Sequence, residues 1–173
     1  MNLIITCARH LELETKQEIS NILDKMGDSE PKIIITNMSG ILTAETKLDP
    51  IDVVNKIKEM VLDEPWCIRY SLRIIPIQKI TETKIESIEE GISDLIKLIS
   101  SHDSYRISIE KRNSDISSQE LISRIANKVK NKVSLEFPDK IILIEILGNK
   151  TGIAIVKKTD ILSVEKTKRS MSE

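Results

Sequence analysis

Few side chains in this 173-residue sequence are of types that commonly catalyse reactions. The two histidines, His10 and His102, are far apart in the sequence, and neither has a metal-ligand or triad partner at a usual spacing. Cys7 and Cys67 are also isolated, so we expect small buried thiols in strands rather than a zinc site or a disulfide. The five glycines are scattered singly and form no glycine-rich phosphate loop. The sequence therefore predicts no catalytic residues, no metal site and no cofactor, and we expect that the protein is not an enzyme.

The charged residues are unevenly distributed along the chain. The formal net charge is -1, which by itself argues against a nucleic-acid partner. However, residues 105–173 carry 14 basic and 9 acidic side chains, whereas residues 1–75 carry 9 basic and 12 acidic ones. A local cluster of cations matters more than the total charge when a polyanion is bound. The asymmetry fits either a basic binding surface or an ordinary solvated face.

The core must come almost entirely from aliphatic side chains. The hydrophobic fraction is 40%, but only four aromatic residues occur: Trp66, Tyr70, Tyr105 and Phe137. Many β-branched residues favour strands, which indicates a mixed α+β protein. No stretch has the roughly 20 apolar residues of a membrane helix, and the N-terminus does not resemble a signal peptide. We therefore expect a soluble, cytoplasmic protein without a membrane partner.

Residues 1–77 show the pattern of a ferredoxin-like lobe. A capping box from Thr15 to Glu18 predicts a helix start, and Asp49 followed by Pro50 predicts a second one. Turn residues between two Ile-rich runs at 31–46 predict a hairpin. The expected elements are a strand at 2–8, a helix to Met26, the hairpin, a helix from Asp49 and a long strand at 66–76. The order β-α-β-β-α-β is the ferredoxin-like arrangement.

Residues 78–165 predict a second, α/β lobe. Capping boxes begin at Thr83 and Ser117, each followed by an amphipathic stripe. A strand at 104–110, a helix at 118–130 and a strand at 140–147 form a βαβ unit, which we expect to be parallel and right-handed. A turn at 148–152 and a short strand at 153–156 follow. Residues 166–173 have no apolar pattern and predict a basic, flexible tail.

The second lobe resembles a THUMP domain over residues about 80–164. The matching pieces are Tyr105-Arg106-Ile107 with Lys111-Arg112-Asn113, Ser118 to Ile122, Asn131 to Leu135 with Pro138-Asp139, Ile142 to Ile146, and Gly152 to Val156. Upstream, Arg73 to Ile77 is similar to the segment that joins a ferredoxin-like lobe to a THUMP lobe. Residues 1–65 match only weakly. The chain is most similar to stand-alone THUMP proteins that assist tRNA cytidine acetylation.

This resemblance implies an RNA-binding adaptor rather than an enzyme. The expected ligand is tRNA, held near its acceptor stem and 3′ end, and the expected partner is a separate tRNA cytidine N4-acetyltransferase. Most multidomain THUMP proteins continue into a catalytic domain, whereas this sequence ends at Glu173, shortly after the THUMP pattern. The longer insertions of eukaryotic relatives are missing, which leaves any partner-docking surface undefined.

The resemblance also suggests which residues form the RNA face. Folded RNA is gripped through phosphates, 2′-hydroxyls and shape, which calls for spaced cations on a rigid surface. Lys111, Arg112 and Asn113 lie where a strand is expected to lead into a helix whose N-terminus offers free N–H groups. The full predicted set is Arg69, Arg73, Lys111, Arg112, Asn113, Lys132, Lys140, Lys157 and Lys158, with Lys150 and the tail cations as weaker candidates. Because aromatic residues are scarce, we expect structured RNA rather than a strand of stacked bases.

Other functions remain open from the sequence. The chain could bind tRNA for a different modification enzyme. It could also be a regulatory protein that binds a small molecule, because ferredoxin-like lobes serve that role as well. The oligomeric state is not determined by the sequence.

Overall fold

A computed structural model describes residues 1–172 and divides the chain into two compact units. The first unit comprises Met1–Pro76 together with the chain from Thr159 onward, and the second comprises Ile77–Lys158. The sequence prediction placed the boundary between residues 77 and 78. Each unit has its own sheet and its own hydrophobic core. The α+β class is therefore confirmed.

The first unit has the ferredoxin-like order expected from the sequence. Its sheet runs β2-β3-β1-β4-β9, and every neighbouring pair is antiparallel. The interior is built from Ile, Leu and Val side chains of the strands and of both long helices. The elements are β1 (Leu3–Cys7), α1 (Glu12–Lys25), β2 (Lys32–Ile35), β3 (Ile41–Glu45), α2 (Pro50–Asp63), a 3-10 turn (Pro65–Cys67) and β4 (Ser71–Pro76).

The end of the chain differs from the expected flexible tail. After Thr159 the chain forms β9 (Leu162–Ser163), which pairs with β4, and then α5 (Val164–Arg169). Leu162 and Val164 are buried in the core of the first unit, and the Lys168 ammonium donates a hydrogen bond to the Ile68 carbonyl at 2.7 Å. Two buried apolar residues are too few to give a periodic pattern that could be recognised in the sequence. Residues 159–165 therefore belong to the first unit and not to the THUMP lobe, and residues 166–169 are helical.

The Glu18 carboxylate accounts for two further differences between the first unit and the sequence prediction. Helix α1 begins at Glu12, before the capping box predicted at Thr15, and the Thr15 hydroxyl donates to the Leu11 carbonyl within the helix. Glu18, the expected partner in that box, accepts the backbone N–H groups of residues 69–71, with Arg69 N at 2.6 Å and Ser71 N at 2.9 Å. Because the N–H groups of Arg69 and Tyr70 are used in this way, these two residues do not extend strand β4, and Pro65–Cys67 forms a 3-10 turn before them. Cys67 accordingly lies in the 3-10 turn and not in a strand, while Cys7 is buried in β1 as predicted.

The second unit contains the predicted βαβ arrangement. Its sheet has the order β5-β8-β7-β6, in which β6 and β7 are parallel and the other pairs are antiparallel. Strand β5 precedes the first helix and was missed because only one of its four residues, Ile80, is apolar. The elements are β5 (Lys79–Glu82), α3 (Ile85–Leu95), a 3-10 turn (Ile96–Leu98), β6 (Tyr105–Arg112), α4 (Ser118–Lys128), β7 (Lys140–Leu147), β8 (Lys150–Val156) and a 3-10 turn (Lys158–Asp160).

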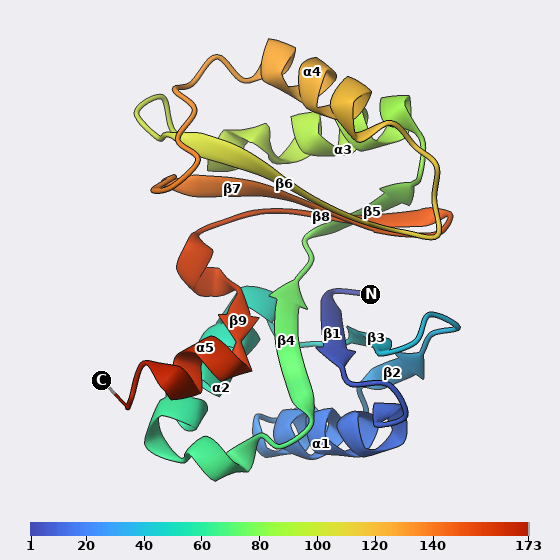
Figure 1. The fold of residues 1–173 in the computed structure, drawn as a ribbon, viewed down its shortest axis with the longest axis vertical. Helices are drawn as coiled ribbons and strands as arrows, with labels where there is room; N and C mark the ends of the chain where they lie inside the picture. Colours follow the sequence, from blue (N-terminus) through green and yellow to red (C-terminus); the bar gives the residue numbers. More distant parts are fainter. Residues whose placement is uncertain (173) are drawn as a thin grey trace. The chain divides into compact units, whose positions relative to one another are not determined.

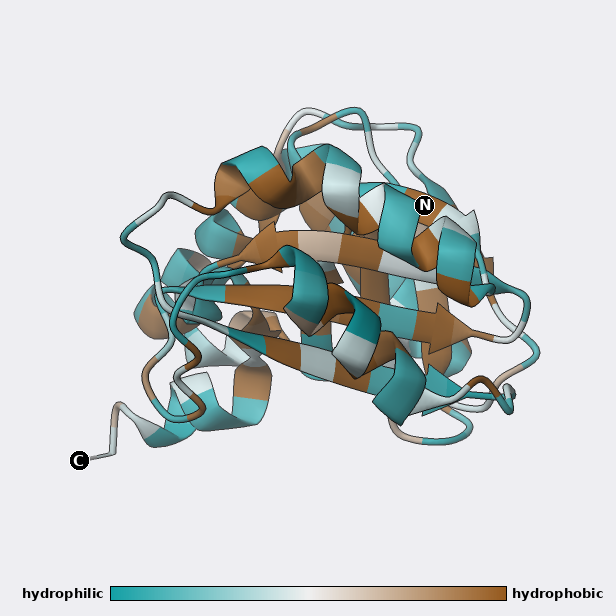
Figure 2. Cartoon of the chain, turned by 90° about the horizontal axis from the view of Figure 1, so that it is seen from above, coloured by the Kyte–Doolittle hydropathy of each residue, from teal (hydrophilic) through white to brown (hydrophobic). Residues whose placement is uncertain are grey.

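Helices α3 and α4 both lie on one face of this sheet (Figure 1). Ile88 and Ile92 of α3 and Leu121 and Ile125 of α4 are buried together with every second residue of β7 and β8. The strands are largely hydrophobic, while the outward surfaces of the helices are largely hydrophilic (Figure 2). The period-3.6 and period-2 patterns of the sequence thus bury one stripe of each helix against one face of the strands.

The helices are short relative to a lipid bilayer. Along the part of the chain that the structure describes, none combines the length and apolar character needed to span a membrane.

Candidate nucleic-acid interface

The predicted RNA-binding residues of the second unit fall at two opposite ends of its sheet. Strands β6 and β7 run in register from Tyr105 beside Lys140 to Arg112 beside Leu147. We name the end where these strands begin the amino end, and the end where they stop the carboxyl end. At about 3.3 Å per residue, the two ends are roughly 23 Å apart. The structure therefore does not bring all the predicted cations together.

Two cations of the carboxyl end, Lys111 and Arg112, are engaged by the protein itself. The Arg112 guanidinium forms an ion pair with the Glu145 carboxylate of β7 at 2.8 Å, and the Glu145 side chain is completely buried. The Lys111 ammonium donates to the Ile116 carbonyl at 3.0 Å. A buried carboxylate needs a compensating cation, so the first role of Arg112 is to neutralise Glu145. This pairing has no local sequence signal, because 33 residues separate the two partners.

The remaining predicted features of the carboxyl end form a turn and a helix start. Asn113 follows β6 with a positive φ of 54°, a conformation that Asn adopts more readily than most residues. Ser117 caps α4 as predicted, because its hydroxyl oxygen accepts the Glu120 N–H at 3.2 Å. Lys150 is exposed where β8 begins, opposite Leu147. Asn113 and Ser117 thus shape the loop between β6 and α4.

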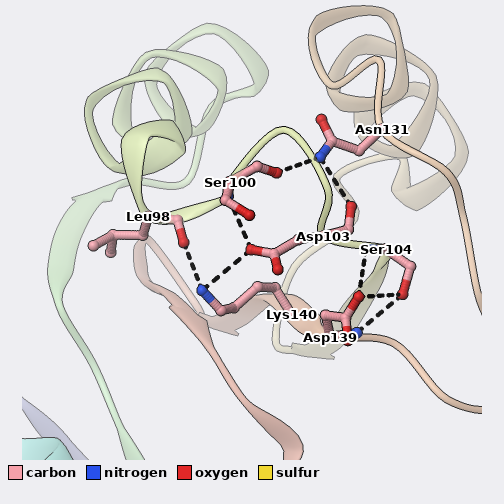
Figure 3. A network of polar contacts seen from close by, with 7 residues as sticks. All are labelled: Leu98, Ser100, Asp103, Ser104, Asn131, Asp139 and Lys140. Atoms are coloured by element: carbon pink, nitrogen blue, oxygen red, sulfur yellow. Dashed lines mark hydrogen bonds and ion pairs between the residues drawn. The ribbon is translucent and has the colours of Figure 1, made fainter.

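At the amino end, Lys140 belongs to a polar network that ties three segments together (Figure 3). Its ammonium donates to the Leu98 carbonyl at 2.7 Å and lies 3.4 Å from the Asp103 carboxylate. Asp103 in turn accepts the Ser100 N–H at 2.8 Å, and this hydrogen bond is the main reason why the pKa of Asp103 is lowered. The Asn131 amide donates to the carbonyls of Ser100 and Asp103. Lys140 is therefore a structural cation that fixes the loop before β6 to the start of β7.

Other lysines at the amino end are exposed. Lys132 lies on the segment beside β6, because the Tyr105 N–H donates to the Lys132 carbonyl at 3.0 Å. Lys157 and Lys158 follow β8, whose last residue pairs with the second residue of β7. Within residues 1–172, no hydrogen bond or ion pair holds the side chains of Lys132 or Lys158. Four backbone segments run side by side here (132–134, β6, β7 and β8), and at about 4.8 Å per neighbour they span roughly 14 Å.

The cations of helix α4 are occupied by α3. Arg124 lies 3.2 Å from the Glu89 carboxylate, with Glu86 and Glu120 slightly farther away, and these carboxylates raise the pKa of Arg124. Lys128 lies 3.6 Å from Glu89. The helical face of the second unit therefore presents paired charges rather than a basic surface.

Arg69 and Arg73 lie in the first unit. Arg69 is exposed in the segment held by Glu18, and not on a strand as expected. Arg73 is half-buried in β4, where its backbone pairs with Thr6 of β1 and Ser163 of β9. These two arginines are therefore parts of different local structures, a loop and a strand.

Two features of the amino end were not predicted from the sequence. Lys130 is exposed in the loop after α4, just before the segment that carries Lys132. Phe137 lies in a bend of the same loop, and 83% of its surface is accessible to solvent. Residues 130–139 show neither helical nor strand periodicity, so the sequence contains no signal for the orientation of these side chains. Tyr105, by contrast, is buried as expected, and burial raises its pKa.

The polar side chains show no arrangement typical of a metal centre. Across residues 1–172, no three His, Cys, Asp or Glu side chains are grouped as metal ligands would be. The amino end has exposed lysine side chains and an exposed aromatic ring, which are groups that can contact phosphates and bases.

Comparison with known families identifies part of the chain. Residues 82–156 match the family model described as the THUMP domain, a region that begins in β5 and ends with β8. The match therefore covers the second unit almost completely. No curated protein sequence matches the chain significantly.

Several solved structures have a similar fold at low sequence identity. PH1313 from Pyrococcus horikoshii OT3 is 18% identical, with a TM-score of 0.63 over 91% of this chain and 55% of that one. TrmN from Thermus thermophilus is 11% identical, with a TM-score of 0.57 over 90% of this chain and 45% of that one. A 4-thiouridine synthetase, solved with RNA and ATP, is 10% identical, with a TM-score of 0.53 over 91% and 42% of the two chains. This chain thus spans about half the length of the structures that it resembles. Its second unit is a THUMP domain, preceded by a ferredoxin-like unit.

Proposed function

We propose that this protein binds tRNA through its THUMP domain and presents it to a separate modification enzyme. The observation that carries the proposal is the coincidence of the THUMP match with the exposed lysines at the amino end of that domain's sheet. THUMP is an RNA-binding domain, and two structures of similar fold are TrmN and a 4-thiouridine synthetase bound to RNA. The shared fold supports tRNA as the class of ligand.

The amino end is the better candidate for the contact surface. Lys130, Lys132 and Lys158 project into solvent there, so contact with RNA phosphates would not require the protein to break an ion pair of its own. At the carboxyl end, by contrast, Arg112 would have to break its ion pair with the buried Glu145 carboxylate. Lys111 and Lys150 remain exposed, and we propose them as secondary contacts.

We further propose that the partner is a tRNA cytidine N4-acetyltransferase and that the bound region is the acceptor stem and 3′ end. Support comes from the resemblance of Tyr105 to Asn113 and of Asn131 to Asp139 to stand-alone THUMP adaptors. A second candidate is a tRNA-binding subunit for another modification. It is favoured by the similar folds of proteins with other modification chemistries, such as 4-thiouridine synthesis.

Direct binding measurements test the RNA-binding part of the proposal. The full chain should bind tRNA with an affinity that falls steeply with salt, because phosphate contacts release counterions. Different tRNAs should bind with similar affinity, because such contacts carry little sequence information. If affinity is undetectable at low salt, RNA binding is excluded.

Modification profiling tests the partner. Mass spectrometry of tRNA nucleosides from a strain lacking this protein should show loss of N4-acetylcytidine. If another modification disappears instead, the second candidate is correct. If the modification profile is unchanged, neither role applies.

A further inference from the structure

Phe137 is the most exposed large hydrophobic side chain among residues 1–172. Its accessible fraction is 83%, compared with 72% for Leu135 in the same loop and 70% for Trp66 in the first unit. The ring lies in a loop that also carries the exposed residues Lys130 and Lys132. The core clusters of the protein do not include it. Such exposure of an aromatic ring leaves its contact surface available to a ligand.

The backbone on both sides of Phe137 is firmly held. On the preceding side, the Ser134 N–H donates to the Tyr105 carbonyl at 2.9 Å, and the Leu135 carbonyl accepts a hydrogen bond from the Arg106 guanidinium at 3.1 Å. On the following side, Asp139 exchanges hydrogen bonds with Ser104, including one of 2.8 Å from the Ser104 N–H. Within the bend, the Phe137 N–H donates to the Ser134 hydroxyl at 3.3 Å. The ring is therefore exposed on a loop that is anchored to the start of β6, not on a free chain.

The charges around this loop favour an anionic ligand. Arg106, Lys130 and Lys132 lie on the segments that flank or anchor the bend, and the carboxylates nearby are Glu136 and Asp139. Asp139 accepts hydrogen bonds from the Ser104 N–H and hydroxyl, but these neutral donors leave its charge in place, so three cations on these segments stand against two carboxylates. An aromatic ring presented among cations is the arrangement by which proteins hold unpaired nucleotides, because the ring stacks on the base while the cations meet the phosphates.

We infer that Phe137 is a stacking platform for an unpaired base of the bound RNA. This inference rests on the proposed function and refines it, since it requires a single-stranded nucleotide at the amino end of the THUMP sheet in addition to structured RNA. The base is held by its π face, so the site accepts any base and discriminates paired from unpaired RNA.

The test compares two RNA hairpins that share one stem, one blunt and one with a short single-stranded 3′ tail. The wild-type protein should bind the tailed hairpin more tightly than the blunt one. Phe137→Leu keeps an apolar side chain of similar size but removes the ring, and it should weaken binding of the tailed hairpin by about 5- to 100-fold, the range expected for one stacked base. Binding of the blunt hairpin should not change. Phe137→Trp should retain the preference, and Leu135→Ala, a change at a neighbouring exposed apolar residue, should leave it intact.

A fluorescent base provides a second readout. With 2-aminopurine in the tail, wild-type protein should quench its emission, and Phe137→Leu should not. If Phe137→Leu binds and quenches like the wild type, the stacking role is overturned, and an apolar contact with a partner protein becomes the explanation of the exposed ring. If the wild type binds neither hairpin nor tRNA, the proposed function itself fails. Because Phe137 makes few contacts in the folded chain, these substitutions should not affect folding.

Discussion

The two ends of the THUMP sheet use their lysine and arginine residues differently. At the carboxyl end, Arg112 neutralises the buried Glu145 and Lys111 closes a loop through the Ile116 carbonyl. At the amino end, Lys132 and Lys158 are solvated, whereas Lys140 is committed to internal partners. The difference shows that a cation near a buried carboxylate balances charge within the protein, whereas a solvated cation can balance the charge of a ligand. Among the described residues, the cations without an internal hydrogen bond or ion pair are the ones available to a ligand, and more of them lie at the amino end.

The largest effect on stability is expected at Arg112. Arg112→Ala removes the cation that faces a fully buried carboxylate, so the free energy of unfolding should fall by about 3 kcal/mol, at the lower end of the cost of breaking a buried ion pair because Arg112 itself is partly exposed. Urea unfolding of the full chain measures this change. Lys111→Ala is the matched control at the neighbouring position, and it should change stability by no more than about 0.5 kcal/mol. Equal effects of the two substitutions would show that Arg112 has no structural role.

Charge reversal at the two ends tests the comparison directly. Lys132→Glu with Lys158→Glu should weaken tRNA binding by roughly tenfold per residue, as expected for the loss of charge-assisted phosphate contacts. It should also make the dependence of log affinity on log salt shallower by about 2. The pair Lys111→Glu with Lys150→Glu makes the same change of charge at the carboxyl end and should have a smaller effect. A larger effect at the carboxyl end would reverse our assignment.

Substitutions of Lys140 and Lys130 test whether a lysine of the amino end stabilises the fold or contacts RNA. Lys140→Met removes the hydrogen bond to the Leu98 carbonyl and the ion pair with Asp103, and it should lower the free energy of unfolding by about 1–2 kcal/mol. At temperatures where the variant stays folded, its tRNA affinity should match that of the wild type. Lys130→Met should show the opposite pattern, with unchanged thermal unfolding and weaker binding. If Lys140→Met lost affinity but not stability, Lys140 would be a direct RNA contact.

The smallest expected effect is on the pH dependence of stability, through the Asp103 carboxylate that contacts Ser100 and Lys140. Because hydrogen bonds from Ser100 and Lys140 lower the pKa of Asp103, its ionised form is favoured in the folded state. Its contribution to stability is therefore fully present above the unfolded pKa, about 3.9, and is lost as pH falls through the lower folded pKa. Asp103→Asn should be less stable than the wild type at neutral pH, and the difference should shrink when unfolding is measured below about pH 4. A difference that does not vary with pH would exclude this role for the carboxylate.

Local sequence signals predicted the fold well where one side chain caps its own helix. Asp49 accepts the Asp52 N–H at 3.0 Å, and Ser117 caps α4 in the same way, so both helix starts were correct. The capping box at Thr15 failed because Glu18 binds the backbone of residues 69–71, about 50 positions away. The order of strands and helices could thus be predicted from periodicity, whereas this helix start and the length of β4 depend on a long-range contact.

The candidate site was less predictable for the same reason. Sequence reasoning selected basic residues of the THUMP lobe as the RNA face but could not determine which of them the protein pairs with its own groups. The partners of Arg112 and Lys140, at Glu145, Leu98 and Asp103, are 33 to 42 residues away. No sequence pattern predicted the exposure of Phe137 either. Its exposure depends on hydrogen bonds from β6 that hold a loop without periodicity.

The return of the chain end to the first sheet has a consequence for biosynthesis. Strand β9 supplies the last neighbour of β4, and Leu162 and Val164 fill positions in a core otherwise built by residues 3–74. During translation, the THUMP segment is complete before these residues leave the ribosome. The unit that is synthesised first is therefore the one that finishes folding last, and until then it carries an unpaired strand edge at β4 and an incompletely filled interior.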